Sequence, residues 1–192
     1  NTIERAAAPG IEAAEIRVDR SGTVTILSGS CTQGQGHETV YKQIVCDKLG
    51  LKPEDVSYIW GDTDKVAFGH GAGGSRSATL GGSAMLMATD KIINKATKIA
   101  AHQLEAAIED IEFNEGTFAV AGTDKTMSLM EAAKNAQSFM TAPPGFEVGL
   151  DEWAAWSPPA PTFPNGCHVA EVEIDPDTGT TEIVRYCMVD DV

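Results

Sequence analysis

The sequence predicts an α+β fold in which helices pack against a mixed β-sheet. Two observations support this prediction. Short runs rich in β-branched residues alternate along the first 110 residues with two segments that repeat apolar side chains at helical spacing, which gives the order β-β-α-β-α. Hydrophobic residues make up 42% of the 192-residue chain and charged residues 22%, a composition that is sufficient for a hydrophobic core and argues against disorder.

The predicted order begins with two strands and a helix. Residues 14–18 and 23–28 are predicted strands because β-branched side chains recur along them, and the turn at 19–22 joins them into a hairpin. A glycine-bearing loop follows. Apolar residues at helical spacing then predict a helix at 37–49, which Gly50 ends.

One more strand and one long helix complete the predicted core. Residues 56–60 form the strand, and a second glycine-rich stretch leads from it to the helix. The helix is predicted at 83–108, because one of its faces repeats apolar residues while most lysines lie elsewhere. Two short strands at 111–113 and 117–120 then flank the turn 114–116 as a hairpin.

The last part of the chain is predicted to contain a short helix and a C-terminal hairpin. Ser128 as the N-cap and Glu131 at the capping-box position predict a helix at 128–136. Six prolines between residues 141 and 164 predict little regular structure there. The C-terminal hairpin is predicted with strands at 167–174 and 180–189 and a turn at 175–179.

The two ends of the chain suggest a piece of a longer protein. The sequence starts at Asn1 without a methionine and stops at Val192, directly after a predicted strand. We therefore expect residues 1–192 to be a fragment. Within it, residues 1–110 would hold the core and both glycine-rich loops. Residues 111–192 would hold the first hairpin, the short helix, the proline-rich crossing and the C-terminal hairpin.

Charge and composition exclude several classes of protein. The 14 Lys and Arg residues against 28 Asp and Glu residues give a net charge of −14, which disfavours binding of nucleic acid or an anionic membrane through overall charge. No run approaches the roughly 20 apolar residues that span a bilayer, and no signal-peptide pattern opens the chain. The cysteines form no Cys-x-x-Cys pair, so we expect free, mostly buried thiols and a cytoplasmic location. They are Cys31, Cys46, Cys167 and Cys187.

Both glycine-rich segments, residues 28–39 and 68–82, lie between a predicted strand and a predicted helix. Unpaired backbone N–H groups at a helix N-terminus carry partial positive charge, so such junctions can bind phosphate. Both segments also contain neutral side chains that can donate hydrogen bonds to a polar ligand: Gln33, Gln35, Thr39, Ser75 and Ser77. Two such loops favour a phosphorylated or dinucleotide-like ligand. The alternative is that the glycines only form turns and close helix–sheet contacts, since neither segment is a Walker A or Gly-x-Gly-x-x-Gly motif.

Other polar residues carry weaker signals, and we expect no metal centre. His37 and His70 lack a nearby carboxylate or thiol that would complete a ligand set. Asp62 and Asp64 could bind Mg²⁺ and serve an independent phosphate-ester enzyme, but aspartates after a strand more often close turns. The acidic residues of the C-terminal hairpin alternate along one strand, which favours a solvated face. They are Glu171, Glu173 and Asp175.

Several segments taken together resemble the molybdenum-binding large subunit of the xanthine oxidase and aldehyde oxidase family, and most of all its aerobic carbon monoxide dehydrogenase branch. The resemblance covers nearly the whole chain in consistent order. The segments that carry it are Gln-Gly-Gln-Gly-His-Glu-Thr at 33–39, Gly-Asp-Thr-Asp at 61–64, Gly-Ser-Arg-Ser at 74–77, Thr-Phe-Pro-Asn-Gly at 162–166, the turn at 175–179, and Val-Asp-Asp-Val at 189–192.

The resemblance implies an oxidoreductase whose molybdenum is held by a molybdopterin, in bacterial members usually as the cytosine dinucleotide. Such enzymes oxidise an aldehyde, an N-heterocycle or carbon monoxide with water as the oxygen source. It also implies an FAD-binding medium subunit and a small subunit with [2Fe-2S] clusters as partners, besides the remainder of the large subunit and a small-molecule substrate. The alternative is a non-catalytic module from the same family that binds a nucleotide or a partner subunit.

The resemblance also assigns cofactor-binding residues. They are Gln33, Gly34, Gln35, Gly36, His37 and Thr39 in the first loop, and Gly73, Gly74, Ser75, Arg76 and Ser77 in the second. Gln35 is implied to lie nearest the molybdenum centre. The family's catalytic glutamate stands in a Gly-x-Gly-Glu-type motif that this chain lacks, so we expect no catalytic residue here and an inactive isolated fragment. The [2Fe-2S] cysteine patterns are absent as well.

Overall fold

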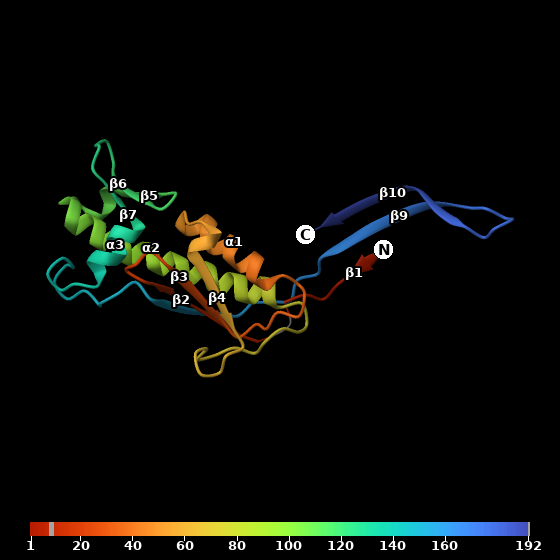
Figure 1. Cartoon of the computed structure of the whole chain (residues 1–192), viewed down its shortest axis with the longest axis horizontal. Coiled ribbons are helices and arrows are strands. Elements are labelled where there is room, and N and C mark those ends of the chain that lie inside the picture. Colours follow the sequence, from red (N-terminus) through yellow and green to blue (C-terminus); the bar gives the residue numbers. More distant parts are fainter. Residues whose placement is uncertain (8–9, 192) are drawn as a thin grey trace.

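A four-stranded sheet with the order β4-β3-β2-β8 forms the centre of the fold (Figure 1). This computed structural model describes residues 1–7 and 10–191. The strands are β2 (Glu12–Val18), β3 (Val24–Ser28), β4 (Val56–Trp60) and β8 (Glu152–Trp156). β2 pairs antiparallel with both β3 and β8, whereas β3 and β4 are parallel. The predicted mixed sheet is confirmed.

Two helices cover one face of this sheet (Figure 1). They are α1 (His37–Leu49) and α2 (Gly82–Leu104). Alternate residues of β2 point to this face, because successive side chains of a strand project to opposite sides. The hydrophobic core therefore joins sheet residues such as Ile16 and Ile26 to Tyr41 of α1 and to Ile92 and Ile99 of α2, all fully buried.

The parallel pairing of β3 and β4 places the two glycine-rich loops at the same edge of the sheet. Parallel neighbours need a crossover connection, and α1 provides it between β3 and β4. The carboxyl ends of the two strands therefore meet at the same edge of the sheet. Each strand is followed there by one of the two glycine-rich segments, and this edge is where ligands bind in open sheets of this kind.

A smaller sheet and a third helix extend the core at the other end of α2 (Figure 1). The sheet has the order β5-β6-β7, with β5 (Ile111–Asn114), β6 (Thr117–Val120) and β7 (Thr126–Ser128), and α3 spans Leu129–Ala136. The capping box that the sequence predicts is confirmed: the Ser128 hydroxyl accepts from the Glu131 amide, and the Glu131 carboxylate accepts from the Ser128 amide.

The C-terminal hairpin projects away from the rest of the molecule (Figure 1). Its strands are β9 (Asn165–Ile174) and β10 (Thr181–Asp191), and the two-residue strand β1 (Thr2–Ile3) pairs with the start of β9. A register shift between Ile183 and Arg185 interrupts the ladder. Large apolar side chains on the hairpin are exposed, including Val172 at 50% and Met188 at 60%.

Most predicted elements are confirmed, and the differences have local causes. α2 ends at Leu104 instead of residue 108, because Glu105 takes a left-handed conformation with φ 53°. β8 lies inside the proline-rich segment that was predicted to be irregular, in a stretch free of proline between Pro144 and Pro158. The strands β1 and β7 and a π-helical turn, η2 (Ser77–Gly81), were not predicted either.

Two findings bear on the expected environment of the chain. The four cysteines are free thiols, but the expectation that most are buried is wrong: Cys46 is buried and Cys31 half-buried, whereas Cys167 and Cys187 are exposed on the hairpin. In the part of the chain that the structure describes, no helix combines the length and the apolar character required to cross a bilayer.

Gly50 offers a test of the packing between α1 and the small sheet. It ends α1 with φ 66°, and a Cβ there would lie 2.1 Å from the carbonyl carbon of Glu115. Gly122 has a similar φ of 74° in open space. We expect Gly122→Ala to lower the free energy of unfolding by about 1 kcal/mol, and Gly50→Ala by a further 1–3 kcal/mol, roughly, from overpacking. Urea unfolding measures both, and equal losses would contradict the close contact.

The capping box gives a pH dependence. Hydrogen bonds from the Ser128 amide and hydroxyl lower the pKa of Glu131. A lowered folded-state pKa contributes stability above the ordinary glutamate pKa of about 4.3, and that stability is lost as the pH falls through the folded-state value. We expect wild type to exceed Glu131→Gln in stability at pH 7 and the difference to shrink as the pH falls below the ordinary glutamate pKa, as measured by urea unfolding. Glu112→Gln, at an exposed position on β5, is the control and should show no such trend.

Candidate functional site

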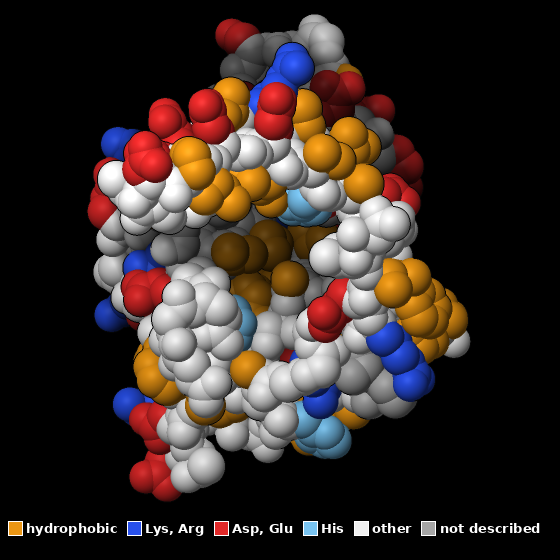
Figure 2. Space-filling model, turned by 90° about the vertical axis from the view of Figure 1, so that its right-hand side faces the viewer, with side chains coloured by type: hydrophobic (Ala, Val, Ile, Leu, Met, Phe, Trp, Pro, Cys, Tyr) orange, Lys and Arg blue, Asp and Glu red, His pale blue; other side chains and the backbone are white. Residues whose placement is uncertain are grey.

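The two glycine-rich loops converge on one cavity of about 470 Å³. They lie at the end of the core from which the hairpin projects (Figure 1), and Figure 2 shows this end hollowed, with hydrophobic side chains on the floor of the hollow. Seven of the residues expected to bind a cofactor line the cavity: Gln33, Gln35, His37, Gly73, Ser75, Arg76 and Ser77. The other four do not line it: Gly34, Gly36 and Gly74 lie in the loops, and Thr39 lies in α1. Val40, Tyr41, Ala72 and Ala78 complete the wall.

A backbone-to-backbone contact holds the two loops together. A Cβ on Gly29 would lie 2.5 Å from the Cα of Gly69, and a Cβ on Gly69 would lie 2.4 Å from the Cα of Gly29. No side chain fits at either position without moving the backbone. Both glycines lie in the glycine-rich segments of the sequence, but no local pattern indicates that they touch each other.

Unusual backbone conformations shape the rim of the cavity. Gly36, the N-cap of α1, has φ 74°, a conformation that costs glycine little. Ser75 has φ 50°, which is uncommon for a residue with a Cβ and is often found at ligand sites. Its hydroxyl donates to the Glu4 carboxylate, and its carbonyl accepts from the Ala7 amide at 3.1 Å.

Tyr41 links the two sides of the cavity. Its ring stacks on His37 with centroids 5.5 Å apart, and its hydroxyl donates to the carbonyl of Ser77 at 2.8 Å. Tyr58 meets the Tyr41 ring edge-on and donates its own hydroxyl to the carbonyl of Ser30 at 2.8 Å. Burial raises the pKa of both tyrosines, so both hydroxyls remain protonated donors at neutral pH.

His37 is the polar side chain most clearly in need of a partner. It is 7% exposed in the first turn of α1, and its Nδ1 atom is buried without a hydrogen bond to any residue that the structure describes. Ser30 Oγ and Arg76 Nε share this condition among the described residues. Buried polar atoms are nearly always paired, so an unpaired one on a cavity wall is consistent with a bound polar ligand.

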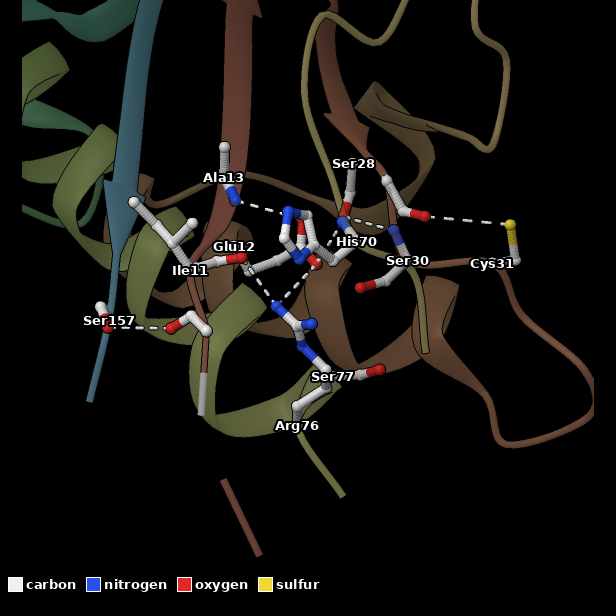
Figure 3. Close-up of polar contacts among 12 residues, drawn as sticks. Ile11, Glu12, Ala13, Ser28, Ser30, Cys31, His70, Arg76, Ser77 and Ser157 are labelled. Atoms are coloured by element: carbon white, nitrogen blue, oxygen red, sulfur yellow. Dashed lines mark hydrogen bonds and ion pairs between the residues drawn. The ribbon is translucent and has the colours of Figure 1, made fainter. Parts of the chain in front are cut away.

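Arg76 is ion-paired with a residue that the sequence analysis missed (Figure 3). Glu12 on β2 is fully buried, and its Oε2 lies 3.5 Å from Arg76 Nη2. The same nitrogen donates to the carbonyl of Ile11 at 2.7 Å. Glu12 also accepts from the amides of Ala13 and His70, each at 3.2 Å. The one signal of this burial in the sequence is an acidic residue directly flanked by the apolar residues Ile11 and Ala13.

The cavity offers mainly neutral donors to a ligand. The first loop contains no Lys or Arg, and Arg76, the only Lys or Arg on the wall, is paired with Glu12. What remains is the start of α1 with its unpaired N–H groups, together with hydroxyl and amide side chains. Such a set can hold phosphate and polar ring edges through hydrogen bonds.

The remaining candidates do not assemble into a metal or acid–base site. Across residues 1–7 and 10–191, no group of three or more His, Cys, Asp and Glu side chains could hold a metal ion. Asp62 closes a turn by accepting from the Asp64 amide at 3.0 Å, and its ion pair with Lys65 and this hydrogen bond lower its pKa. The backbone N–H of His70 is bonded to Glu12. The acidic residues of β9 and its turn are exposed, as expected.

His168, which carried no signal in the sequence, is part of a cluster on the hairpin. Its Nδ1 lies 2.8 Å from the Tyr186 hydroxyl and its Nε2 lies 3.0 Å from Asp190. The cluster belongs to the projecting sheet and does not line the cavity between the loops.

The chain is similar to large subunits of molybdenum enzymes. It is 38% identical over 180 residues to the carbon monoxide dehydrogenase large chain of Hydrogenophaga pseudoflava, which covers 94% of this chain and 22% of that protein. It is 36% identical over 182 residues to the nicotine 6-hydroxylase large subunit of Paenarthrobacter nicotinovorans, again 94% of this chain and 22% of the relative. The chain thus spans about a fifth of the length of these curated relatives.

Solved structures and a family match agree with this similarity. Reconstituted carbon monoxide dehydrogenase from Oligotropha carboxidovorans superposes with a TM-score of 0.89 at 34% identity, over 98% of this chain and 25% of that chain. Quinoline 2-oxidoreductase from Pseudomonas putida 86 gives a TM-score of 0.84 at 33% identity, over 98% of this chain and 26% of that chain. Residues 2–192 match the molybdopterin cofactor-binding domain family. The chain belongs to this family of molybdopterin cofactor-binding domains.

Proposed function

We propose that this chain is the cofactor-binding part of a molybdenum hydroxylase large subunit, and that the cavity between its two glycine-rich loops holds part of the cofactor. The observation that carries the proposal is the convergence of both loops on one wall, at the edge where β3 and β4 end. Residues that lie about 40 positions apart in the sequence, such as His37 and Ser77, line the same cavity.

The residues of the cavity suit a pterin with a phosphate-bearing tail. His37 Nδ1 is a buried polar atom without a partner in the described part of the chain. The start of α1 provides N–H groups for phosphate oxygens, and the hydroxyl of Ser77 and the side-chain amides of Gln33 and Gln35 are neutral donors. The Ser75 hydroxyl donates to Glu4, so it is available to a ligand as an acceptor. Val40 and Ala78 provide apolar surface for a ring face. When bound, the cofactor supplies the redox chemistry, while these residues bind and orient it.

The proposed binding set is the one implied by the resemblance. It comprises Gln33, Gly34, Gln35, Gly36, His37 and Thr39 from the first loop and Gly73, Gly74, Ser75, Arg76 and Ser77 from the second. Gln35 is proposed to lie nearest the molybdenum. The extended run of donors over both loops favours a dinucleotide form of the cofactor, and we propose the cytosine dinucleotide.

The proposed reaction is oxidation of a small molecule with water as the oxygen source. Carbon monoxide, nicotine and quinoline appear in the names of the relatives, so carbon monoxide and N-heterocycles are the favoured substrate classes, beside aldehydes. The catalytic base is proposed to lie in the remainder of the large subunit. Electrons would leave to [2Fe-2S] clusters and FAD on a small and a medium partner subunit, in the cytoplasm.

The remainder of the large subunit is the nearest proposed partner. The chain spans 22% of the curated relatives' length, and its hairpin carries exposed apolar side chains at Val172, Ile183 and Met188. Burial of such side chains against another part of the same polypeptide would stabilise the hairpin.

Replacement of Gln35 tests the site in the full-length protein that contains this domain. We expect Gln35→Ala to lower molybdenum content or turnover roughly tenfold or more, the range found when partners around a metal are removed. Gln43→Ala, at an exposed position on α1 outside the cavity wall, is the matched control and should leave both unchanged. Metal analysis and a dye-reduction assay measure the two quantities. Wild-type values for both in Gln35→Ala would contradict the assignment.

Molybdenum content of the wild type distinguishes the proposed function from the alternative. We expect about one molybdenum per full-length subunit after expression in a host that makes the cofactor. The isolated 192-residue chain should show no turnover, because the catalytic base lies outside it. If the full-length wild type carries no molybdenum while a known molybdenum enzyme from the same host is loaded, the chain is a non-catalytic module that binds a nucleotide or a partner subunit.

A further inference from the structure

Glu12 is a charged side chain in a place where charge is costly. It lies on β2, the strand that pairs with both β3 and β8, and none of its surface is exposed. A carboxylate without water is stable only when ionic and hydrogen-bond partners replace the water. The residues that pair with Glu12 therefore indicate which part of the structure the buried carboxylate holds in place.

The partners of Glu12 lie at both ends of one short segment of the second loop (Figure 3). At one end, the His70 amide donates to Oε2 at 3.2 Å, and Oε1 lies 2.9 Å from where a Gly69 Cβ would be. At the other end, Arg76 Nη2 lies 3.5 Å from Oε2. One carboxylate thus contacts residues 69–70 and residue 76, and residues 71–75 lie between these contacts.

The side chain of Arg76 faces the sheet. Its Nη2 donates to the Ile11 carbonyl at 2.7 Å, and Nη1 and Nη2 lie 3.6 Å from where a Gly10 Cβ would be. Only 8% of Arg76 is exposed. The guanidinium is therefore packed against Gly10 and Ile11, which precede β2, and against Glu12, so its charge is balanced inside the protein.

The segment that Glu12 holds includes part of the cavity wall. Ala72, Gly73 and Ser75 lie between the two anchored ends and line the cavity. Arg76 directly precedes η2, and its carbonyl accepts from Leu80 at 2.7 Å, so the anchor continues into the helical turn that leads to α2.

We propose that Glu12 is a positioning residue that fixes residues 70–76 in their ligand-binding shape before the ligand arrives. Arg76 then belongs to the proposed binding set through this arrangement of the cavity wall, and its guanidinium does not pair with a phosphate of the ligand. This inference rests on the proposed function and deepens it. The anionic part of the ligand is then held by helix N–H groups and neutral side chains. Loss of either partner of the pair leaves an uncompensated buried charge, whereas loss of both charges does not.

Charge removal in the full-length protein tests the pair. Glu12→Gln and Arg76→Met should each reduce the molybdenum bound per subunit roughly tenfold or more, and the double variant should regain a content within about threefold of wild type. Glu15→Gln, on the same strand and outside the cavity wall, is the matched control and should bind as much molybdenum per subunit as wild type. A double variant as poor as Arg76→Met would show that Arg76 binds the ligand directly and would overturn the proposal, as would normal loading of Glu12→Gln.

Hydrogen exchange on the wild type gives a second test that needs no variant. The Glu12 contact predicts that the His70 amide is protected in cofactor-free full-length protein, to within about threefold of its protection in the loaded protein. Exchange at the rate of an unstructured loop before loading would overturn the proposal. Failure of this inference can be told apart from failure of the proposed function. A wild-type protein without molybdenum contradicts the proposed function, whereas fast exchange of the His70 amide contradicts only the role of Glu12.

Discussion

The contact between the backbones of Gly29 and Gly69 is the constraint on which the rest of the site depends. The two chain segments approach so closely that a single methyl group would overlap the opposite Cα. This approach is possible because β3 and β4 are parallel neighbours whose carboxyl ends lie at one edge of the sheet. From that crossing, one loop runs to the start of α1 and the other to η2, and the cavity lies between them.

Charge balance explains how an acidic protein could carry the proposed anion site. The net charge of −14 disfavours polyanions at long range. At short range, the relevant groups are the partial charges of the first turn of α1 and the hydroxyl and amide dipoles around it. The one arginine of the wall has its own buried carboxylate, so the site does not depend on a cation that salt would screen.

Local sequence patterns predicted the elements that depend on neighbouring residues. They did not predict the contacts that join residues far apart in the chain. The helix ending at Gly50 and the capping box at Ser128 follow from local patterns, and both are confirmed. The family resemblance rests on short runs and is supported by the match over residues 2–192. The strand β8 was missed because flanking prolines dominate the local signal, although antiparallel pairing with β2 stabilises it.

The same reasoning applies to the candidate site. Seven expected residues line the cavity, because loops that follow parallel strands are brought to one edge of the sheet. Glu12 escaped the sequence analysis because its partners, His70 and Arg76, lie about 60 positions away. Apolar spacing predicted the helix that contains Tyr41, but the hydrogen bond from Tyr41 to Ser77 depends on how α1 packs against η2.

The projecting hairpin has open edges. β10 pairs only with β9 in the described part of the chain, and β1 covers no more than the first residues of β9, so N–H and C=O groups along both outer edges lack strand partners. Such edges are templates for the addition of another strand, including one from a second copy. Glu171, Glu182 and Arg185 interrupt the apolar pattern and oppose indiscriminate pairing. A strand that paired with either edge would therefore protect the hairpin from edge-to-edge association between copies.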